Sequence, residues 1–266
     1  MKCRVCTGET QTLFTLPIMG KHEGTYRQCL ECGTLQVENP HWLREAYTDS
    51  HLTLLDVGAL HRGMNTWAGT HLIMDIWGFT RSLDWGTGDG LLPRYLRDRG
   101  FDAYGEDKYS PRTHCRAFTP PPGWTPQIIT AWEVWEHWEN PGEELDKILS
   151  HNPEVHLFST ELWRGQGRDW GYLAPTEGQH ITFYTPDALR RMSESRGYAV
   201  YGLGRETFIM FRRTEQNMIR AHIATALWNG WRWESLRGTL LNSSAPGIGR
   251  DAGIVLSQMK GERGLK

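Results

Sequence analysis

The chain has 266 residues, a formal net charge of −2 and a pI near 6.6. This length suits one large domain or two modest ones. The balanced charge gives no overall field to attract nucleic acid or an anionic membrane, although it does not exclude a local basic patch. The start, MKCRVC, lacks the apolar segment of a secretory signal, and no apolar run reaches the ~18 residues that span a bilayer. The sequence therefore predicts a soluble, cytoplasmic protein without a membrane partner, and it leaves monomer and homodimer open.

Four of the five cysteines fall in two pairs near the amino end. Cys3 and Cys6 form one C-x-x-C motif, and Cys29 and Cys32 form a second. Four thiolates in two such pairs are typical ligands of tetrahedral Zn²⁺, whereas the alternative, two disulfides, is disfavoured in a reducing compartment. We therefore expect a zinc ribbon over residues 1–38, with a closed site that serves structure. The fifth cysteine stands alone and is interpreted as an ordinary buried thiol.

Residues 39–80 carry apolar side chains at mixed spacings of three and four, which is the pattern of a helix. The segments WLREAYTDSHLTLLDVG and MNTWAGTHLIMDIWGF show this pattern most clearly. We expect a helical linker that joins the ribbon to the rest of the chain.

From residue 81 to residue 213 short apolar strands alternate with helices. We expect strands in SLDW, FDAYGED, PQIITAW and EVHLFST. We expect helices in GLLPRYLRDRG, which Gly100 closes, and in PGEELDKILS, which Pro141 begins. This alternation predicts an α/β domain with a mostly parallel sheet and helices on both of its faces. In such sheets, ligands bind beyond the carboxyl ends of the strands.

The stretch LDWGTGDG, residues 83–90, follows the first of these strands. Its glycines, Gly86, Gly88 and Gly90, allow a tight turn and a close approach of a ligand to the backbone. The spacing G-x-G-x-G is neither the Walker phosphate loop nor the G-x-G-x-x-G dinucleotide motif. Asp107 ends the second strand, where a carboxylate can accept hydrogen bonds from both hydroxyls of a ribose.

The glycine loop and Asp107 together resemble motif I and the following acid of class I S-adenosylmethionine-dependent methyltransferases. The segment EVWEHWENP is similar to the pattern E-V-L-E-H-x-x-[DN]-P of one branch, and HITFYTPDAL is similar to that branch's H-x-x-[FY]-[FY]-[ST]-x-x-x-L segment. The matches span residues 83–200 and imply a Rossmann-like sheet with an antiparallel last strand. The four-cysteine ribbon resembles that of sugar C-methyltransferases, which carry a further carboxy-terminal domain for which this chain is too short.

The resemblance implies that S-adenosylmethionine is the cofactor. It places the loop backbone against the methionine moiety, Trp85 beside the cofactor, Asp107 on the ribose and Glu133 near the methyl donor, with residues 39–80 as a cover. The alternatives are a plain tight turn for the glycines, a surface turn for Asp107 and a structural role for Glu133. The full set of expected cofactor contacts is Asp84, Trp85, Gly86, Gly88, Gly90, Asp107, Trp132 and Glu133.

Methyl transfer from a sulfonium is an in-line displacement that needs no metal, so the protein supplies alignment, exclusion of water and in some cases a base. The expected catalytic residues are His180, Glu133 and His137. In the sugar-modifying relatives a histidine in the His180 segment is implicated as the base, but their neighbouring acid is Gln179 here. His180 is therefore either the base or a structural histidine. His137 is either a base or a packing residue at a helix start, where Glu136 favours the helix dipole.

The loop ELWRGQGRDWGYLAPTEGQ is the expected wall of the acceptor site. Its aromatic side chains can stack on a flat or sugar-like acceptor, and Arg164 and Arg168 can bind an anionic group. The alternative is that the same residues fold the loop onto the domain, and Tyr184 is either a core residue or a substrate contact. The expected substrate-binding residues are Trp163, Arg164, Trp170, Tyr172 and Tyr184.

The carboxyl end begins with two adjacent strands, GYAVYGLG and ETFIMFRR, which fit the antiparallel hairpin that closes this fold. Residues 242–266 are rich in Gly and Ser and predict a flexible tail. Residues 214–241 predict a helix that either packs on the domain or forms a dimer seam, through a stripe of Ile219, Ile223, Leu227 and Trp231.

The sequence thus predicts a methyltransferase that acts on a polar small molecule, such as a sugar or a nucleotide-sugar. One alternative is a methyltransferase of RNA, DNA or protein that docks its macromolecule through the ribbon and the arginines, which the near-neutral charge disfavours. A second alternative is a non-catalytic interaction module built on zinc and the 13 tryptophans. The intact glycines and Asp107 argue against that second alternative.

Overall fold

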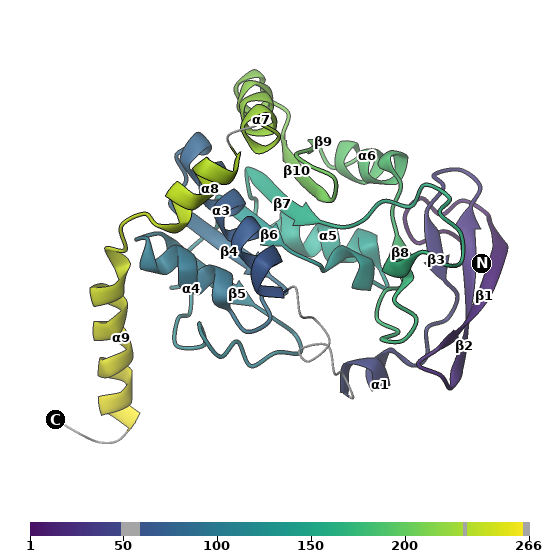
Figure 1. Cartoon of the computed structure of the whole chain (residues 1–266), viewed down its shortest axis with the longest axis horizontal. Coiled ribbons are helices and arrows are strands. Elements are labelled where there is room, and N and C mark those ends of the chain that lie inside the picture. The colour runs from purple at the N-terminus through teal and green to yellow at the C-terminus, as the bar shows by residue number, and fades with distance from the viewer. Residues whose placement is uncertain (49–58, 231–232, 263–266) are drawn as a thin grey trace.

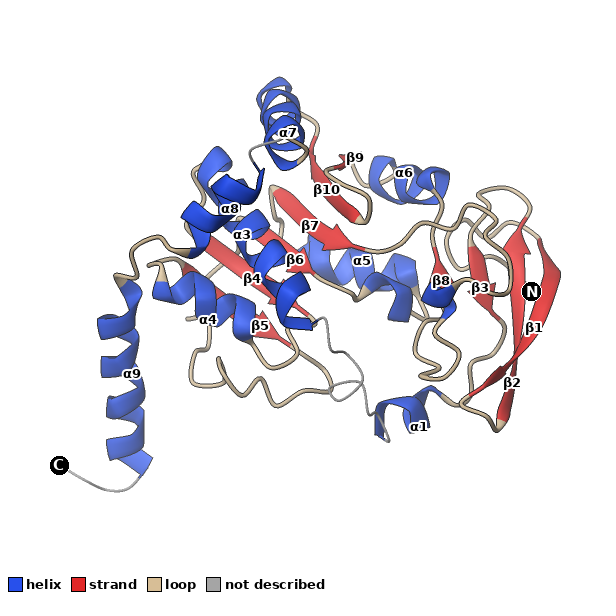
Figure 2. Cartoon of the chain, viewed as in Figure 1, coloured by secondary structure: helices blue, strands red, loops and turns tan. Residues whose placement is uncertain are grey.

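The computed structural model describes residues 1–48, 59–230 and 233–262 of the chain. Two sheets dominate it, a larger one of six strands and a smaller one of four (Figure 1, Figure 2). The larger sheet has the order β5–β4–β6–β7–β10–β9, from β4 (Arg81–Trp85), β5 (Asp102–Glu106), β6 (Ile128–Ala131), β7 (Val155–Ser159), β9 (Tyr198–Gly202) and β10 (Thr207–Arg212).

The larger sheet is mostly parallel. β4 pairs in parallel with β5 and β6, and β6 pairs in parallel with β7, whereas β10 runs antiparallel to both β7 and β9. The central strands IITA and VHLFS are buried along their whole length, as expected for strands that are covered on both faces. The predicted α/β fold, with a mostly parallel sheet and an antiparallel last strand, is therefore confirmed.

Helices cover both faces of this sheet: α3 (Ala59–Trp77), α4 (Leu91–Asp98), α5 (Pro141–Ser150), α6 (Pro186–Glu194) and α7 (Glu215–Trp228). Successive strand residues point to opposite faces. Ile129 and Phe158 therefore pack with α5 and α6, while Ile128 and Leu157 pack with α3, α4 and α7. Within the described residues, none of the helices combines the length and the apolar character needed to cross a bilayer.

The smaller sheet contains the amino-terminal ribbon and one strand from the central domain. The backbone N–H of Val37 donates to the carbonyl of Ile181 at 2.9 Å. The Arg4 guanidinium donates to the carbonyl of Val37 at 2.7 Å and to that of Ile181 at 3.2 Å. Backbone pairing with the central domain therefore completes the sheet of the ribbon. The strand order is β1–β2–β3–β8, from β1 (Thr10–Ile18), β2 (His22–Cys29), β3 (Leu35–Val37) and β8 (Thr182–Phe183).

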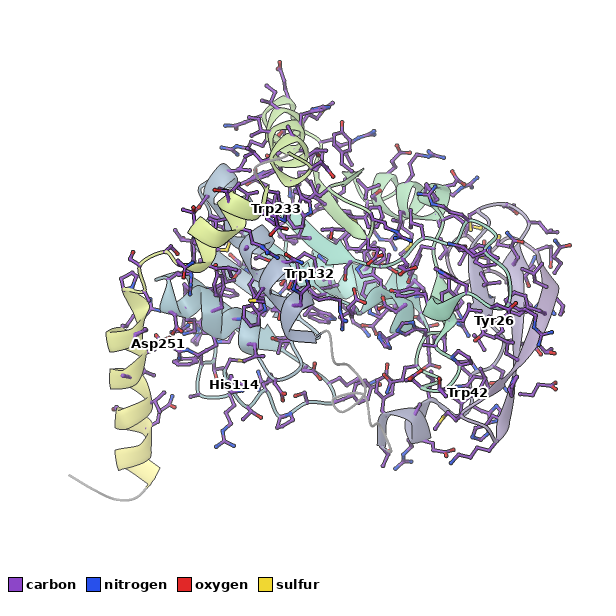
Figure 3. The ribbon with its side chains drawn as sticks, viewed as in Figure 1. Tyr26, Trp42, His114, Trp132, Trp233 and Asp251 are labelled. Atoms are coloured by element: carbon purple, nitrogen blue, oxygen red, sulfur yellow. The ribbon has the colours of Figure 1, made fainter. Side chains whose placement is uncertain are left out.

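The predicted helical linker contains α1 (Leu43–Thr48) and α3 among its described residues. The helical pattern over residues 49–58 lies outside the described residues. α1 is fastened to the segment that precedes β8, because the Trp42 indole donates to the carbonyl of Gly178 at 2.9 Å. Figure 3 shows Trp42 near the smaller sheet.

The helix expected over 214–241 is divided into α7 and α8 (Trp233–Leu241). The C-cap of α7 is Asn229, which is followed by glycine, a pair that favours turns. The small side chains of Ala221 and Ala224 face the sheet. α7 therefore packs on the domain through a different face from the predicted apolar stripe. The described residues of that stripe are 56%, 47% and 40% exposed: Ile219, Ile223 and Leu227. The fourth stripe residue, Trp231, lies outside the described residues.

The tail predicted to be flexible instead contains α9 (Gly247–Glu262), at the far end of the molecule from the smaller sheet (Figure 1). Gly247 allows a close approach to α4, because a Cβ atom there would lie 1.7 Å from the Arg97 carbonyl oxygen. The buried Asp251 carboxylate accepts hydrogen bonds from Arg97 Nε at 2.8 Å and Nη2 at 3.0 Å (Figure 3). This long-range ion pair orders a segment whose composition predicts disorder.

Candidate functional site

The glycine loop turns at the carboxyl end of β4. Gly86, Gly88 and Gly90 are all in the left-handed region, at φ values of 72°, 55° and 81°. Packing enforces two of them, because a Cβ at Gly86 would lie 2.6 Å from Val134, and a Cβ at Gly90 would lie 2.4 Å from Cys115 Sγ. A Cβ at Gly88 would meet nothing within 4 Å. The loop therefore leaves open space over Gly88, where a ligand can approach the backbone.

Asp107 holds this loop from the end of β5. Its Oδ2 accepts a hydrogen bond from the Gly88 N–H at 2.8 Å, and its Oδ1 accepts from the N–H groups of Tyr109 and Ser110, both at 2.7 Å. A carboxylate has about four lone-pair positions, so one remains for a ligand hydroxyl.

Asp84 supports the loop from within the sheet. Its carboxylate accepts hydrogen bonds from the hydroxyls of Thr87 and Thr130, both at 2.6 Å. Burial raises the pKa of Asp84 to about 6. Because Asp84 is only 6% exposed, it acts on the loop through Thr87 rather than as an open contact surface.

The other expected cofactor residues lie at the ends of β4 and β6. The Trp85 ring lies 6.0 Å from the His151 ring, on the α5 side of the sheet. The Trp132 indole N–H is buried without a hydrogen-bond partner among the described residues, near the middle of the molecule (Figure 3). Glu133 has a left-handed φ of 54°, its N–H donates to Ser159 Oγ at 2.8 Å, and its carboxylate accepts from that hydroxyl. The structure therefore fixes the exposed Glu133 at the strand edge.

Glu136, His137 and His180 meet where β6 and β7 end. The first two belong to the short helix η1 (Trp135–His137), and His180 precedes β8. Glu136 Oε1 lies 3.8 Å from His137 Nε2 and 3.9 Å from His180 Nε2, and the two imidazole centroids are 5.0 Å apart. Glu136 is fully buried, and its carboxylate oxygens have no hydrogen-bond partner within the described part of the chain.

A backbone contact defines the tautomer of His180, whereas His137 Nδ1 is buried without a hydrogen-bond partner among the described residues. His180 Nδ1 lies 2.6 Å from the Tyr172 carbonyl oxygen. A carbonyl only accepts, so Nδ1–H is the donor, and the lone pair of Nε2 faces Glu136. Burial raises the pKa of Glu136 well above its usual range, lowers that of His137 to about 3 and lowers that of His180. Burial therefore disfavours the charged form of all three groups.

Glu136 and Tyr47 were not selected from the sequence as site residues. Glu136 sits beside His137 in the chain, but a carboxylate at a helix start is common, and His180 lies far away in the sequence. Tyr47, on α1, stacks on Tyr109 with a centroid distance of 4.1 Å and lies 6.2 Å from the His137 ring. α1 therefore spans from the Asp107 loop to the cluster.

Some residues of the expected acceptor wall lie beside the Glu136–His137–His180 cluster, and others lie in the core. The Tyr172 ring lies 4.6 Å from His180, and Trp170 lies 5.3 Å from Tyr172 and 5.6 Å from Trp163. These rings form a continuous aromatic series. Tyr184 is fully buried and donates its hydroxyl hydrogen bond to the Trp135 carbonyl at 2.8 Å. Of the two alternatives for Tyr184, the structure places it in the core.

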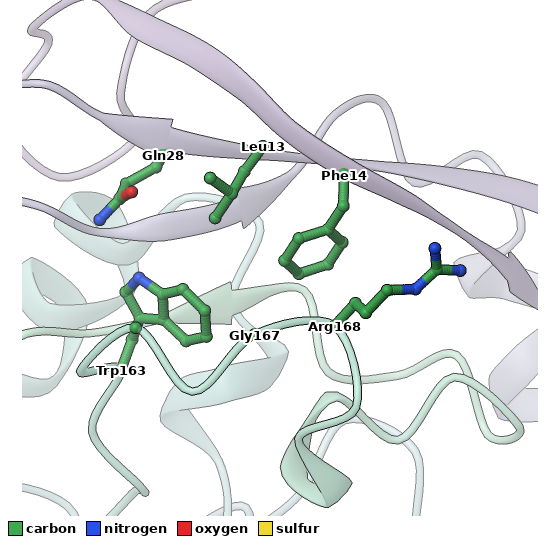
Figure 4. A pocket seen from close by; sticks show the side chains of 7 residues that line it. Leu13, Phe14, Gln28, Trp163, Gly167 and Arg168 are labelled. Carbon is green, nitrogen blue, oxygen red and sulfur yellow. The ribbon is translucent and has the colours of Figure 1, made fainter.

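A pocket lies between the ribbon and this loop (Figure 4). Arg164 is an exposed residue of the same loop, and its backbone N–H donates to the Gln166 side chain at 2.8 Å. The ribbon contributes Leu13, Phe14 and Gln28 to the lining of this pocket, and the glycine loop contributes none of the lining residues. Its lining residues are Leu13, Phe14, Gln28, Trp163, Gly165, Gly167 and Arg168.

The four paired cysteines converge at one point of the ribbon. Cys3 Sγ lies 3.6 Å from Cys32 Sγ, Cys6 Sγ lies 3.5 Å from Cys29 Sγ, and all four sulfur atoms lie within 4.8 Å of one another. Four thiolates about 2.3 Å from one tetrahedral ion would lie about 3.8 Å apart. The cysteine cluster therefore has the dimensions of a zinc site.

Comparison with known proteins agrees with this architecture. The model of a family described as a methyltransferase domain matches residues 40–203, which is more than half of the chain. No curated protein matches. The 1,6-didemethyltoxoflavin-N1-methyltransferase of Burkholderia thailandensis is 14% identical, with a TM-score of 0.50 over 76% of this chain and 100% of that one. A magnesium protoporphyrin IX methyltransferase from Synechocystis PCC 6803 is 17% identical, with a TM-score of 0.44 over 64% and 92%.

The sheet order and the family match lead to one assignment. The larger sheet has parallel strands in the order β5–β4–β6–β7 and an antiparallel β10 beside them, with the glycine loop after β4. The chain belongs to the methyltransferase-domain family and is an S-adenosylmethionine-dependent methyltransferase.

Proposed function

We propose that this enzyme methylates a polar small molecule whose accepting atom lies against the Glu136–His137–His180 cluster. The observation that carries the proposal is the position of that cluster, at the same sheet edge as the glycine loop and beside the aromatic series of Tyr172 and Trp170. Ligands of such sheets bind beyond the carboxyl ends of the strands. One edge thus carries both a donor side and an acceptor side.

The donor side takes S-adenosylmethionine, which supplies an activated methyl group on its sulfonium. The backbone at Gly86, Gly88 and Gly90 faces the methionine moiety, and the free lone pair of Asp107 accepts from the ribose. Trp132 and Glu133 border the cofactor, while Asp84 and Trp85 support the strand that presents the loop. The open space over Gly88 supports this arrangement.

On the acceptor side, the accepting atom loses its proton. As the acceptor atom bonds to the methyl carbon, the S–CH₃ bond breaks, S-adenosylhomocysteine leaves, and the acceptor proton passes to the cluster. His180 and His137 present neutral imidazoles there. Glu133 lies between the two sides, and its contact with Ser159 fixes its carboxylate.

The acceptor class follows from the loop. Trp170 and Tyr172, backed by the buried Trp163, offer aromatic faces that suit a sugar or another ring, and the exposed Arg164 and Arg168 offer cations for an anionic group. A sugar that carries a phosphate-containing group, such as a nucleotide-sugar, matches both features.

The ribbon takes a structural Zn²⁺ on Cys3, Cys6, Cys29 and Cys32. The sulfur separations of 3.5 and 3.6 Å support this assignment, and the four thiolates leave no open position for water. The ion would fasten the ribbon whose fourth strand, β8, follows directly after His180 and Ile181.

The donor side is tested by calorimetric titration with S-adenosylhomocysteine on the wild type, Gly88→Ala and Gly20→Ala. Gly20 is the matched control, because it has a φ of 70°, a Cβ there also meets nothing within 4 Å, and it lies in the ribbon. Each substitution brings about 1–2 kcal/mol of left-handed backbone strain. We expect one-to-one binding by the wild type and by Gly20→Ala, and at least tenfold weaker binding by Gly88→Ala. Absence of binding by folded wild type, or equal affinity in all three proteins, would overturn the assignment.

A further inference from the structure

We propose that Glu136, His137 and His180 form a binding site for one divalent transition-metal ion. The proposal deepens the proposed function, on which its role at the acceptor rests. The juxtaposition itself stands on geometry alone. A carboxylate oxygen and two imidazole nitrogens from two separate segments of the chain lie within 4.8 Å of one another.

The spacing of the three donor atoms suits an ion rather than direct hydrogen bonds. Glu136 Oε1 is 3.8 and 3.9 Å from the two Nε2 atoms, beyond the ~3.2 Å limit of an N–H···O bond. Ligand atoms about 2.1 Å from one ion would lie roughly 3.0–3.6 Å apart, so the observed 3.8 and 3.9 Å are wider by a few tenths of an ångström. Small movements of the side chains would complete the coordination.

The burial of Glu136 supplies a second, independent observation. This carboxyl is fully buried, and neither of its oxygens has a partner within hydrogen-bond distance among the residues that the structure describes. The hydroxyls of Tyr172 and Thr160 act on its pKa from beyond that distance. An unpaired buried polar group is costly, and natural proteins seldom keep one without a partner. A cation would satisfy both the carboxylate and the imidazole lone pairs.

The surroundings of His180 match those of a metal-binding histidine. His180 donates through Nδ1 to the Tyr172 carbonyl, which fixes the ring and leaves Nε2 as the ligand atom. Such hydrogen bonds from the second ring nitrogen are usual in metal sites. The Tyr172 hydroxyl in turn lies 3.5 Å from Thr160 Oγ1, so the supporting groups come from the ends of two elements.

The donor set determines the class of ion and of substrate. Two imidazoles and one carboxylate suit Zn²⁺, Mn²⁺ or Fe²⁺, whereas Mg²⁺ and Ca²⁺ prefer oxygen ligands alone. Three protein ligands leave coordination positions open. Because the side chains of His137 and His180 are 19% and 18% exposed while Glu136 is 0%, the open positions lie on the imidazole side. They would take oxygen atoms of the acceptor, such as adjacent sugar hydroxyls, and would make those hydroxyls more acidic. Because the ion then occupies the Nε2 lone pairs, the acceptor proton of the metal-loaded enzyme passes to solvent rather than to the imidazoles.

Manganese is the probe, because thiolate sites such as the cysteine cluster select softer ions. Binding of Mn²⁺ would be measured on protein that carries one Zn²⁺ per chain, which the four thiolates take in preference to the mixed site. The readout is the electron paramagnetic resonance signal of free Mn²⁺, with and without excess Mg²⁺. We expect one Mn²⁺ per chain that Mg²⁺ does not displace. Affinity should fall at least tenfold in Glu136→Gln and in His180→Asn. It should stay unchanged in Glu139→Gln, an exposed glutamate on the same segment.

The same protein samples are titrated with S-adenosylhomocysteine, which separates the two proposals. Retained S-adenosylhomocysteine binding in Glu136→Gln and His180→Asn shows that these variants are folded and that only the metal site has changed. If folded wild type binds no Mn²⁺, or if both variants keep wild-type Mn²⁺ affinity, the metal site is wrong, whatever the outcome for the donor side.

Discussion

His156 is a buried imidazole whose hydrogen bonds fix it in the neutral state. Its Nδ1–H donates to the Ile129 carbonyl at 3.0 Å, and its Nε2 accepts from the Trp135 indole at 3.2 Å. A protonated ring would have no acceptor for Nε2–H. Burial lowers the pKa of His156 from 6.5 to about 4.

This residue makes stability depend on pH in a predictable direction. Between pH 6.5 and 4 the unfolded chain takes up the proton that the native chain refuses, so stability falls as the pH falls through this window. The shift corresponds to about 3 kcal/mol when complete. Urea unfolding at pH 7 and pH 5 should show a smaller difference for His156→Gln than for wild type. The exposed His41→Gln should keep the wild-type difference, and an unchanged difference in His156→Gln would refute the assignment.

At the scale of one element, α9 is held on α4 by ion pairs that centre on the buried Asp251 carboxylate, which lies near Arg97, Arg250 and Arg94. Asp251 is fully buried, and its carboxylate accepts from Arg97 and from Arg250 Nε at 2.9 Å. The Arg97 guanidinium is itself nearly buried and lies 4.0 Å from the Phe118 ring centroid. Removing the carboxylate would leave a buried cation without its main partner.

We therefore expect Asp251→Ala to lower the free energy of unfolding by about 3 kcal/mol, as in other broken buried pairs. The double variant Arg97→Met with Asp251→Leu should recover most of this loss, because it removes both charges and keeps apolar volume. Lys147→Ala, which breaks an exposed ion pair with Glu144, should change stability by less than about 1 kcal/mol. Urea unfolding measures all three. Equal, small effects of Asp251→Ala and Lys147→Ala would show that α9 is not held by this pair.

For the whole molecule, the sequence predicts what is local and periodic. The alternation of apolar strands and helices was sufficient for the parallel sheet, and the glycine loop was visible because its residues are neighbours in the chain. By contrast, Arg97 and Asp251 are 154 positions apart, so the Gly- and Ser-rich end was predicted as a tail. The pairing of β8 with β3 and the approach of His180 to Glu136 likewise depend on tertiary contacts that periodicity does not encode.

The cysteine cluster connects this long-range organisation to the proposed site. β8 begins two residues after His180 and is paired with β3, whose neighbour β2 ends at Cys29. The glycine loop lies on β4, in the other sheet. Loss of the proposed zinc should therefore disturb the position of His180 and leave the donor side intact.

We expect about one zinc per chain in protein purified without chelator, and clearly less in Cys29→Ser. In that variant, Mn²⁺ binding should weaken at least tenfold, because the segment that carries His180 loses its support, while S-adenosylhomocysteine affinity should remain within about threefold. Cys115→Ala, at the cysteine outside the cluster, should keep its zinc. Metal analysis and titrations with Mn²⁺ and with S-adenosylhomocysteine, all on one preparation, test these expectations. Well under one zinc per wild-type chain would refute the zinc ribbon. Zinc loss without any change in Mn²⁺ binding would show instead that the central domain holds His180 on its own.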